Sequence, residues 1–222
     1  MRLYYETVSK TLLECLKKLM ENNAFKEFIL VGGTALCLQR GHRMSVDIDL
    51  FTDNEYGSMN LEKIKKALIN IFPYTESLET LNERNLGYMV YVGNNKEEKI
   101  KLDLFYTEKF IMPIIEQDGL RLASLQDIAA MKMLAITNNK RKKDFWDLHE
   151  LLECFTLEEI IQFGVLRNPY SLDIKDIICS LQNANNYSQD STIKCFKGKF
   201  WELIVEDIET TVEQYINNSF SS

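Results

Sequence analysis

The sequence is poor in glycine and proline, with 9 and 3 among its 222 residues, and it contains no internal repeat and no low-complexity linker. This length provides for one large domain or two small ones with a buried core. Hydrophobic residues make up 45% of the chain and charged residues 27%, as in an ordinary globular protein. Against this background, the two adjacent glycines at positions 32 and 33 call for an explanation.

The chain also lacks an excess of positive charge and any long hydrophobic run. Its formal net charge of −7 argues against the broad basic surface of a protein that coats duplex nucleic acid, while a local basic patch remains compatible with it. No uncharged apolar stretch approaches the roughly 18 residues of a membrane-spanning helix, and the charged N-terminal region lacks the apolar core of a signal peptide. We therefore expect a cytoplasmic protein without a membrane partner.

Paired cysteines are absent as well. The five cysteines are odd in number, none forms a C-x-x-C pair, and each lies in an apolar or helical context. This pattern predicts buried free thiols in a reducing compartment. The five are Cys15, Cys37, Cys154, Cys179 and Cys195.

Hydrophobic periodicity divides the chain into two halves. Up to about residue 122, helical spacing alternates with short β-rich runs, whereas the later pattern is almost entirely helical. The expected helices span 3–21, 34–39, 60–71, 125–136, 141–154, 157–165, 173–184 and 199–217. The expected strands span 28–31, 47–51, 75–82, 88–92, 99–106, 110–115 and 120–122, and an exposed polar loop is expected at 183–191.

These elements predict an α+β fold. A mixed β-sheet flanked by helices is expected over residues 1–122, and a helical bundle over residues 123–222. The change of pattern near residue 123 is the expected domain boundary. Ser124, with Asp127 three residues later, resembles the capping box that opens a helix.

Two carboxylates alternate with apolar residues on the strand predicted for 47–51. Side chains at positions i and i+2 of a strand share a face, so Asp47 and Asp49 project together while Ile48 and Leu50 face the core. Such a pair is tolerated when it is solvated or when a divalent cation lies between the carboxylates. The Asp-x-Asp sequence alone is therefore compatible with a surface pair and with a Mg²⁺ or Mn²⁺ site.

A Gly-Gly-Thr sequence stands where one predicted strand ends and a predicted helix begins. Glycine lets an anion approach the backbone, and the N–H groups at a helix start favour negative charge. Thr34 can cap the helix or donate its hydroxyl to a phosphate. Gly32 and Gly33 alone are compatible with a simple tight turn, but with Asp47 and Asp49 they offer an NTP both N–H donors and a metal.

Asp103 is the candidate for a third carboxylate of the same site. On the strand predicted for 99–106, apolar residues occupy one face, and Asp103 lies on the other face with Lys99 and Lys101. Because aspartate is disfavoured inside strands, its presence here indicates a function, either metal ligation or the activation of an attacking hydroxyl. A surface aspartate between lysines is the alternative. This strand is suited to pair beside the strand of Asp47 and Asp49.

Five sequence motifs follow one another over about residues 25–155. They are G-G-T-A-L at 32–36, R-x-H-R-x-S-x-D-I-D-L-F at 40–51, K-L-D-L-F at 101–105, S-L-x-D-I-A-A-M-K at 124–132 and R-K-K-D-F-W-D-L at 141–148. Their composition and order resemble the AbiEii/AbiGii-type nucleotidyltransferases, a branch of the polymerase-β-like minimal nucleotidyltransferase fold. Residues beyond 155 match no motif of this family.

The resemblance implies a role for each matching position. The glycine-rich signature, Gly32, Gly33 and Thr34, would hold the nucleotide phosphates. The metal-binding and catalytic carboxylates would be Asp47, Asp49 and Asp103. Ser45 matches the serine of S-x-D-x-D and Arg43 matches a basic position, and both are counted with the nucleotide-binding residues.

The downstream motifs imply further site residues in the helical half. Lys132 matches a helical lysine that contacts nucleotide phosphates, although a lysine extending its stem over the core explains the pattern as well. Asp144 and Asp147 match acidic positions, with Asp144 counted as catalytic and Asp147 as nucleotide-binding. Their i, i+3 spacing places them on one helix face. His42 is expected in a surface loop unless it contacts a phosphate.

The predicted function is Mg²⁺-dependent or Mn²⁺-dependent transfer of a nucleoside monophosphate from an NTP to an acceptor, with residues 123–222 completing the active-site cleft. The resemblance implies an RNA acceptor, the 3′ end of tRNA in particular, and a toxin of a toxin–antitoxin or abortive-infection pair with an antitoxin as partner. Two alternatives remain open: transfer to a small molecule or a protein, and a degenerate nucleotide-binding regulatory module. The sequence does not define the oligomeric state.

Overall fold

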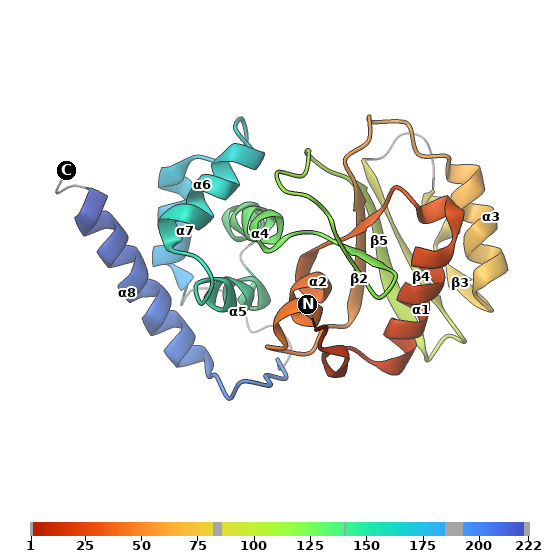
Figure 1. Cartoon of the computed structure of the whole chain (residues 1–222), viewed down its shortest axis with the longest axis horizontal. Coiled ribbons are helices and arrows are strands. Elements are labelled where there is room, and N and C mark those ends of the chain that lie inside the picture. The colour runs from red at the N-terminus through yellow and green to blue at the C-terminus, as the bar shows by residue number, and fades with distance from the viewer. Residues whose placement is uncertain (1, 82–85, 140, 185–192, 220–222) are drawn as a thin grey trace. The chain divides into compact units, whose positions relative to one another are not determined.

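The computed structural model describes residues 2–81, 86–139, 141–184 and 193–219. The chain divides into two compact units, Met1–Ala123 and Ser124–Ser222. In Figure 1, the colour runs by residue number from red at the N-terminus to blue at the C-terminus. Within the described ranges, no helix has the length and apolar character needed to cross a membrane. Each unit has a hydrophobic core of its own, so each is described by itself below.

The first unit is built on a seven-stranded mixed sheet with the strand order β3-β4-β5-β2-β1-β7-β6. Its strands are β1 (Ile29–Leu30), β2 (Asp47–Thr52), β3 (Tyr74–Glu76), β4 (Gly87–Gly93), β5 (Lys99–Tyr106), β6 (Ile115–Gln117) and β7 (Leu120–Leu122). Strand β2 runs parallel to β5 and β1 runs parallel to β7, whereas the other neighbours are antiparallel. The mixed sheet predicted from the alternating pattern is confirmed.

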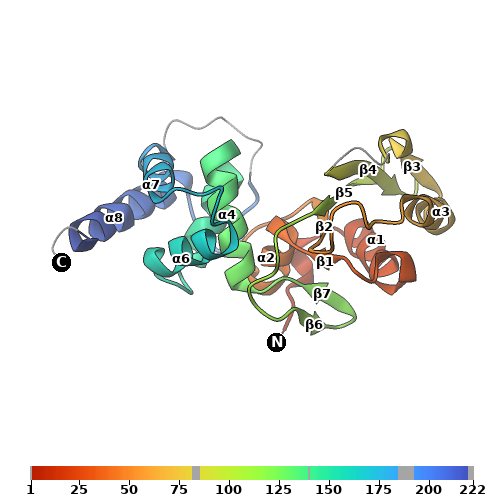
Figure 2. The ribbon, with the colours of Figure 1, turned by 90° about the horizontal axis from the view of Figure 1, so that it is seen from above.

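Three helices accompany this sheet, as Figure 2 shows from above: α1 (Lys10–Glu21), α2 (Gly32–Arg40) and α3 (Leu61–Ile71). Helix α1 packs across β2, β4, β5 and β7, and α2 packs against β2. The apolar residues of the two central strands, Ile48, Leu50, Leu102 and Leu104, are fully buried. This burial leaves the alternate residues of β2 and β5 on the opposite face, as the alternation predicts.

The second unit consists of five helices, α4 (Leu125–Asn139), α5 (Lys142–Leu151), α6 (Leu157–Arg167), α7 (Ile174–Gln182) and α8 (Trp201–Ser219). Helix α4 packs against α5, α6 and α7, and α8 packs against α5, α6 and α7. Ser124 Oγ accepts a hydrogen bond from the backbone N–H of Asp127 at 2.9 Å, which confirms the predicted cap. The helical second half is therefore as expected, with ends shifted by a few residues.

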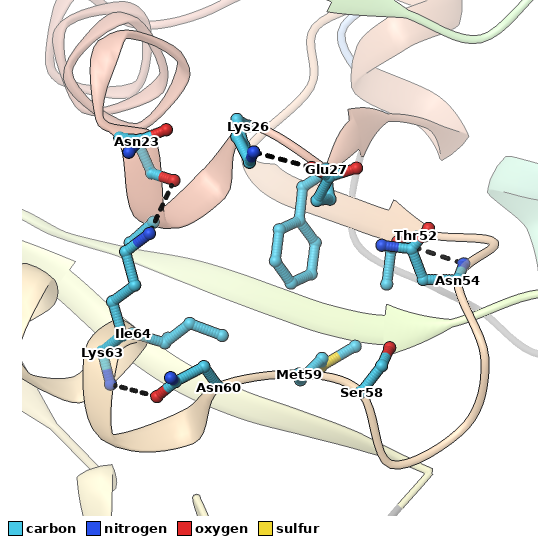
Figure 3. A pocket seen from close by; sticks show the side chains of 12 residues that line it. Asn23, Lys26, Glu27, Thr52, Asn54, Ser58, Met59, Asn60, Lys63 and Ile64 are labelled. Carbon is cyan, nitrogen blue, oxygen red and sulfur yellow. Dashed lines mark hydrogen bonds and ion pairs between the residues drawn. The ribbon is translucent and has the colours of Figure 1, made fainter.

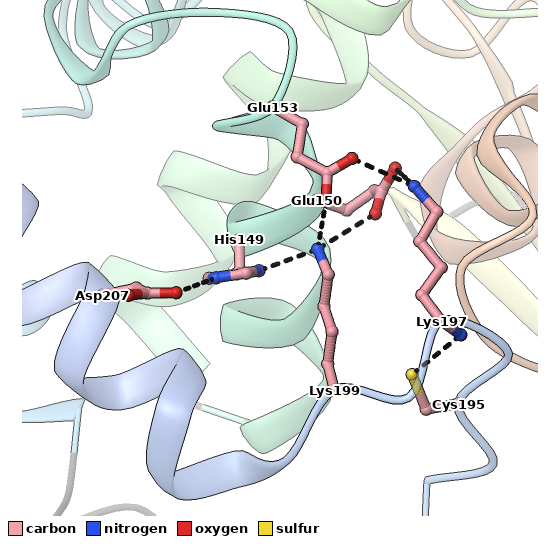
Figure 4. A network of polar contacts seen from close by, with 7 residues as sticks. All are labelled: His149, Glu150, Glu153, Cys195, Lys197, Lys199 and Asp207. Atoms are coloured by element: carbon pink, nitrogen blue, oxygen red, sulfur yellow. Dashed lines mark hydrogen bonds and ion pairs between the residues drawn. The ribbon is translucent and has the colours of Figure 1, made fainter.

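A network of charged side chains ties the segment before α8 to α5, as Figure 4 shows. Glu150 is buried, and its carboxylate contacts Lys197 Nζ at 2.6 Å and Lys199 Nζ at 3.4 Å. His149 lies between Lys199, 3.0 Å from its Nδ1, and Asp207, 2.8 Å from its Nε2. His149 therefore has a structural role in this network.

Removing Lys199 is expected to weaken this attachment. Lys199→Met should lower the free energy of unfolding by about 2 kcal/mol, because the ammonium makes charge-assisted hydrogen bonds to Glu150 and Glu153. Urea unfolding measures the change, and Lys194→Met, which removes an exposed lysine stacked on Phe196, should change the free energy by less than about 0.5 kcal/mol. Equal effects of the two substitutions would contradict the role of the network.

The same network makes the second unit sensitive to acid. Partial burial, the largest effect, disfavours the ionised form of Glu153, but hydrogen bonds from Lys199 and Lys197 lower its pKa from 4.5 to about 2. A lowered pKa means that the stabilisation is complete above pH 4.5 and is lost as the pH falls towards 2. The destabilisation caused by Lys199→Met is therefore expected to shrink as the pH falls from 4.5 towards 2.

Several sequence expectations are wrong in detail. Cys15 and Cys37 are buried as expected, but Cys154 and Cys195 are half-exposed and Cys179 is exposed, although no disulfide joins any of the five. The strand expected at 110–115 begins only at Ile115, and His42, expected in a surface loop, is buried. Most of the polar loop expected at 183–191 lies outside the described residues.

Candidate active site

Strands β2 and β5 place three carboxylates on one face of the first unit. Asp47 and Asp49 alternate with fully buried residues of β2, and both are half-buried. Because β2 and β5 run parallel in register, Asp49 lies directly opposite Asp103, and Asp47 lies opposite Lys101. We call Asp47, Asp49 and Asp103 the acidic face. The strand pairing suggested by the sequence is confirmed, and it makes Asp49 and Asp103 neighbours.

Lys101 shares the acidic face with these carboxylates. Its ammonium contacts Oδ2 of Asp103, whose other oxygen, Oδ1, is buried and has no hydrogen-bond partner within the described residues. Burial, the largest single effect, disfavours the ammonium form, but the hydrogen bond to Asp103 and the neighbouring negative charges together outweigh it and raise the pKa of Lys101. The negative charges of Asp47 and Asp49 act in the same direction. Lys101 is therefore a firmly charged ammonium ion on a cluster of carboxylates.

The acidic face provides the donor atoms that a hard divalent cation requires. In the described part of the chain, no three His, Cys, Asp or Glu side chains are grouped closely enough to hold a metal ion as they stand. The donor set nevertheless fits Mg²⁺ or Mn²⁺, because it consists of carboxylate oxygens and includes the buried Oδ1 of Asp103. Asp49 and Asp103 lie on adjacent strands, about 5 Å apart, so rotation of side chains suffices to bring their oxygens together.

Helix α2 begins beside the acidic face. Gly32 has a φ of 65°, and a Cβ atom at this position would lie 2.5 Å from Oδ2 of Asp49. The residue before the helix, Val31, makes no side-chain cap, while its own N–H donates to the carbonyl of Asp49 at 2.9 Å. The sequence predicts a helix that begins at Thr34, after the glycines, whereas in the structure both glycines belong to α2. Gly32 brings the first turn of this helix against Asp49.

Thr34 and Ser45 fix the geometry behind the helix start. The hydroxyl of Thr34 is buried, lies 2.8 Å from Ser45 Oγ and donates to the carbonyl oxygen of Asp47 at 2.5 Å. Arg43 is buried and donates from its guanidinium to the carbonyl of Met44 at 3.0 Å. Thr34 thus links α2 to β2, which holds the glycines and the carboxylates in a fixed relation. A direct phosphate contact of Thr34, Ser45 or Arg43 stays a prediction.

Gly32 is expected to tolerate no side chain. The left-handed backbone of Gly32→Ala should cost about 1–2 kcal/mol of stability, and the displaced Asp49 should lower nucleotide transfer by about 10²-fold. Gly57→Ala is the matched control, since Gly57 also has a positive φ of 85° but has nothing within 4 Å of the added Cβ. Urea unfolding and a transfer assay separate the two effects. Equal transfer rates for the two variants would contradict the importance of the Gly32–Asp49 contact.

The second unit brings together the three site residues predicted there. Lys132 Nζ lies 2.8 Å from Asp144 Oδ1 and 2.5 Å from Asp147 Oδ2, and both carboxylates are fully buried. Arg141 Nε adds a contact of 2.8 Å to the other oxygen of Asp144. Burial, the largest effect on Asp144, favours the neutral form, but Lys132 and Arg141 together lower the pKa of this carboxyl. The shared helix face of Asp144 and Asp147 is therefore confirmed, and Lys132 pairs with both.

A pocket of about 140 Å³ opens at the far end of β2 from the acidic face (Figure 3). Its polar groups serve the neighbouring backbone: Asn60 Oδ1 accepts from Lys63 N–H at 2.9 Å, and Lys63 Nζ donates to the carbonyl of Asn23 at 3.3 Å. The pocket contains one carboxylate among its described lining residues, Glu27, which pairs with Lys26 at 3.4 Å. The candidate site is therefore assigned to the acidic face and not to this pocket.

Two charged residues of these clusters received no role from the sequence. In the sequence, Lys101 only flanks Asp103 and Arg141 only begins a motif, yet in the structure they contact Asp103 and Asp144 respectively. The signal for Lys101 is its i−2 position relative to Asp103, which places both side chains on one strand face. For Arg141 the signal is the i, i+3 spacing to Asp144 at a helix start.

Comparison with known proteins places this geometry in context. Residues 14–168 match the family described as nucleotidyl transferase AbiEii toxin, Type IV TA system. An uncharacterised protein of Aquifex aeolicus is 26% identical over 220 residues, covering 92% of this chain and 96% of its own length.

Two solved structures share the fold. A putative nucleotidyltransferase from H. pylori is 20% identical, with a TM-score of 0.55 and coverage of 91% of this chain and 90% of its own. MenT4, a nucleotidyltransferase toxin from Mycobacterium tuberculosis, is 12% identical, with a TM-score of 0.50 and coverage of 91% of this chain and 83% of its own. At these identities the likeness is one of fold.

Proposed function

The chain belongs to the AbiEii nucleotidyltransferase toxin family and is a nucleotidyltransferase, and we propose that it transfers a nucleoside monophosphate from an NTP to RNA at the acidic face. The observation that carries this proposal is the registered pair of Asp49 and Asp103 beside the start of α2 at Gly32. This arrangement sets carboxylates for a divalent cation next to backbone N–H groups for a phosphate.

Asp47, Asp49 and Asp103 are the residues that would hold Mg²⁺ or Mn²⁺ in this proposal. When bound, the metal would neutralise charge on the triphosphate and activate the acceptor hydroxyl as a Lewis acid. The buried Oδ1 of Asp103 supports the assignment, because a buried carboxylate oxygen without a partner is costly unless it ligates or accepts a hydrogen bond. The three carboxylates together also repel one another less when a cation is present.

The start of α2 would orient the triphosphate. The N–H groups of Gly32 and Gly33 belong to the first turn of the helix, the end at which the helix dipole favours negative charge. Thr34 positions these groups through its hydrogen bond to the carbonyl of Asp47, so that donors and carboxylates move as one body. Transfer then depends on holding the α-phosphate in line with the acceptor hydroxyl, a contribution of position and charge.

The choice of RNA, and of the 3′ end of tRNA in particular, is supported by membership of a toxin family alone. An antitoxin is proposed as partner on the same ground. The net charge of −7 gives no support for a nucleic-acid acceptor. Two further expectations stay predictions. One is that the nucleotide is contacted by Lys132, Asp144 and Asp147, and the other is that residues 123–222 complete the cleft.

The acceptor is identified by offering the purified protein each of the four NTPs, labelled at the α-phosphate, together with separate pools of tRNA, other RNA, protein and small molecules. The proposal predicts metal-dependent labelling of the tRNA pool at its 3′ end. Labelling of the protein or small-molecule pool instead would replace RNA as acceptor and leave the transfer chemistry intact. Absence of labelling in every pool, together with absence of NTP binding, would favour a regulatory module.

A further inference from the structure

Lys101 stands out among the cations of the first unit because it lies on the acidic face itself. It is opposite Asp47 across the parallel pair β2 and β5, and it contacts Asp103 two residues further along its own strand. The side chain of Lys101 is 31% exposed and that of Asp103 is 15% exposed. The ammonium therefore neutralises a half-buried carboxylate while it retains a path into water.

The contact of Lys101 engages the carboxylate that a metal would need. Oδ2 of Asp103 faces the ammonium, whereas its Oδ1 is buried without a partner in the described structure. The three aspartates do not form a ready-made metal site as they stand. A divalent cation held by these carboxylates would bring its two charges close to the ammonium, and the two cations would repel each other.

We infer that Lys101 is an internal counter-cation of the acidic face, which holds Asp103 in the metal-free protein and is displaced when a divalent cation binds. The inference rests on the proposed function, since it assumes the metal site of Asp47, Asp49 and Asp103. Lys101 thereby sets metal affinity: it keeps the carboxylates from repelling one another without metal and weakens the binding of the metal that replaces it. It is a positioning residue, because it acts through Asp103.

Lys99 provides a matched comparison on the same strand and the same face. Its Nζ contacts Glu76 at 2.6 Å and lies 4.5 Å from the ring centroid of Tyr91. The exposures of the two lysine side chains are similar, 26% for Lys99 and 31% for Lys101. Removing Lys99 therefore removes a strand lysine of similar exposure whose partner is not one of the three aspartates.

The test is a calorimetric titration of the purified full chain with Mn²⁺, without any nucleotide. Lys101→Met is expected to bind Mn²⁺ about tenfold more tightly than the wild type, because a positive charge near the site is lost. Lys99→Met is expected to stay within about twofold of the wild-type affinity, because Glu76 lies outside the acidic face. Lys101→Arg keeps the charge and is expected to bind Mn²⁺ no more tightly than the wild type.

Thermal unfolding supplies a second readout. Without metal and at low ionic strength, Lys101→Met should unfold at a lower temperature than the wild type, and Mn²⁺ should raise its Tm by more than it raises that of the wild type. If Lys101→Met does not fold without metal, the same comparison is made with Lys101→Gln, refolded in the presence of Mn²⁺.

The outcomes separate the inference from the proposed function. If Lys101→Met binds Mn²⁺ no more tightly than the wild type, the role of Lys101 is overturned and the metal site stays in place. A folded wild type that binds no Mn²⁺ overturns the metal site, and the inference falls with it. Tighter binding by Lys101→Met but not by Lys99→Met or Lys101→Arg is the result that supports the inference.

Discussion

Asp49→Asn is expected to lower nucleotide transfer by about 10³-fold while leaving the fold intact. The substitution keeps the shape of the side chain but removes the charge of the carboxylate that lies opposite Asp103 and against Gly32. Because Asp49 is half-buried beside another carboxylate, the loss of its charge also relieves repulsion. The free energy of unfolding in urea should therefore be unchanged or slightly higher, so that lost transfer is not the result of lost structure.

Asp53→Asn is the control for this prediction. Asp53 follows β2 directly and pairs with Lys109 at 3.7 Å, away from the acidic face. The same chemical change there is expected to leave the transfer rate within about twofold of the wild type, since it removes a partly exposed ion pair and leaves an oxygen that can still accept from the backbone N–H of Phe110. An Asp49→Asn protein that retains more than about a tenth of the wild-type rate would remove this residue from the catalytic centre.

Lys132→Met is expected to lower the free energy of unfolding by about 3–5 kcal/mol. The substitution leaves two fully buried carboxylates, Asp144 and Asp147, without the ammonium they share. The lowered pKa of Asp144 gives the same result a pH dependence. Its stabilisation is present at neutral pH and is lost as the pH falls below the ordinary value of 3.8, so the destabilisation by Lys132→Met should be largest at neutral pH and shrink in acid.

Urea unfolding in a mutant cycle measures the coupling. Adding Asp144→Asn and Asp147→Asn to Lys132→Met should restore part of the lost stability, because the two buried negative charges that lost Lys132 are removed, although Asp144 also gives up its charge pair with Arg141. Lys175→Met on the exposed side of α7 should change the free energy of unfolding by less than about 0.5 kcal/mol. A loss below about 1 kcal/mol in Lys132→Met would show that this buried cluster contributes little to the stability of the protein.

The central strands could be predicted because their pattern is local. Asp47 and Asp49 alternate with Ile48 and Leu50, and this alternation alone determines which face is buried. Gly41, with a φ of 68°, ends α2 as its lack of a side chain predicts. The start of α1 was placed too early, because Ser9 caps the helix by accepting from Leu12 N–H and a 3-10 turn precedes it.

The contacts of the charged residues could not be predicted in the same way. The pairing of Lys132 with Asp144 and Asp147 joins two helices, and the neutralisation of Asp103 by Lys101 depends on which strand lies beside β5. Neither is contained in the periodicity of a single segment. The sequence therefore predicted candidate charged residues in each unit, whereas the partners of these residues within each unit required the tertiary structure.

The most direct test of nucleotidyl transfer compares one NTP labelled at its α-phosphate with the same NTP labelled at its γ-phosphate. Both are incubated with the wild-type protein, Mg²⁺ or Mn²⁺ and the tRNA pool. If the acidic face catalyses nucleotidyl transfer, the acceptor gains the α-label, and the γ-label is released as pyrophosphate. Transfer of the γ-label to the acceptor, or equal α-labelling by wild type and Asp49→Asn, would contradict the account.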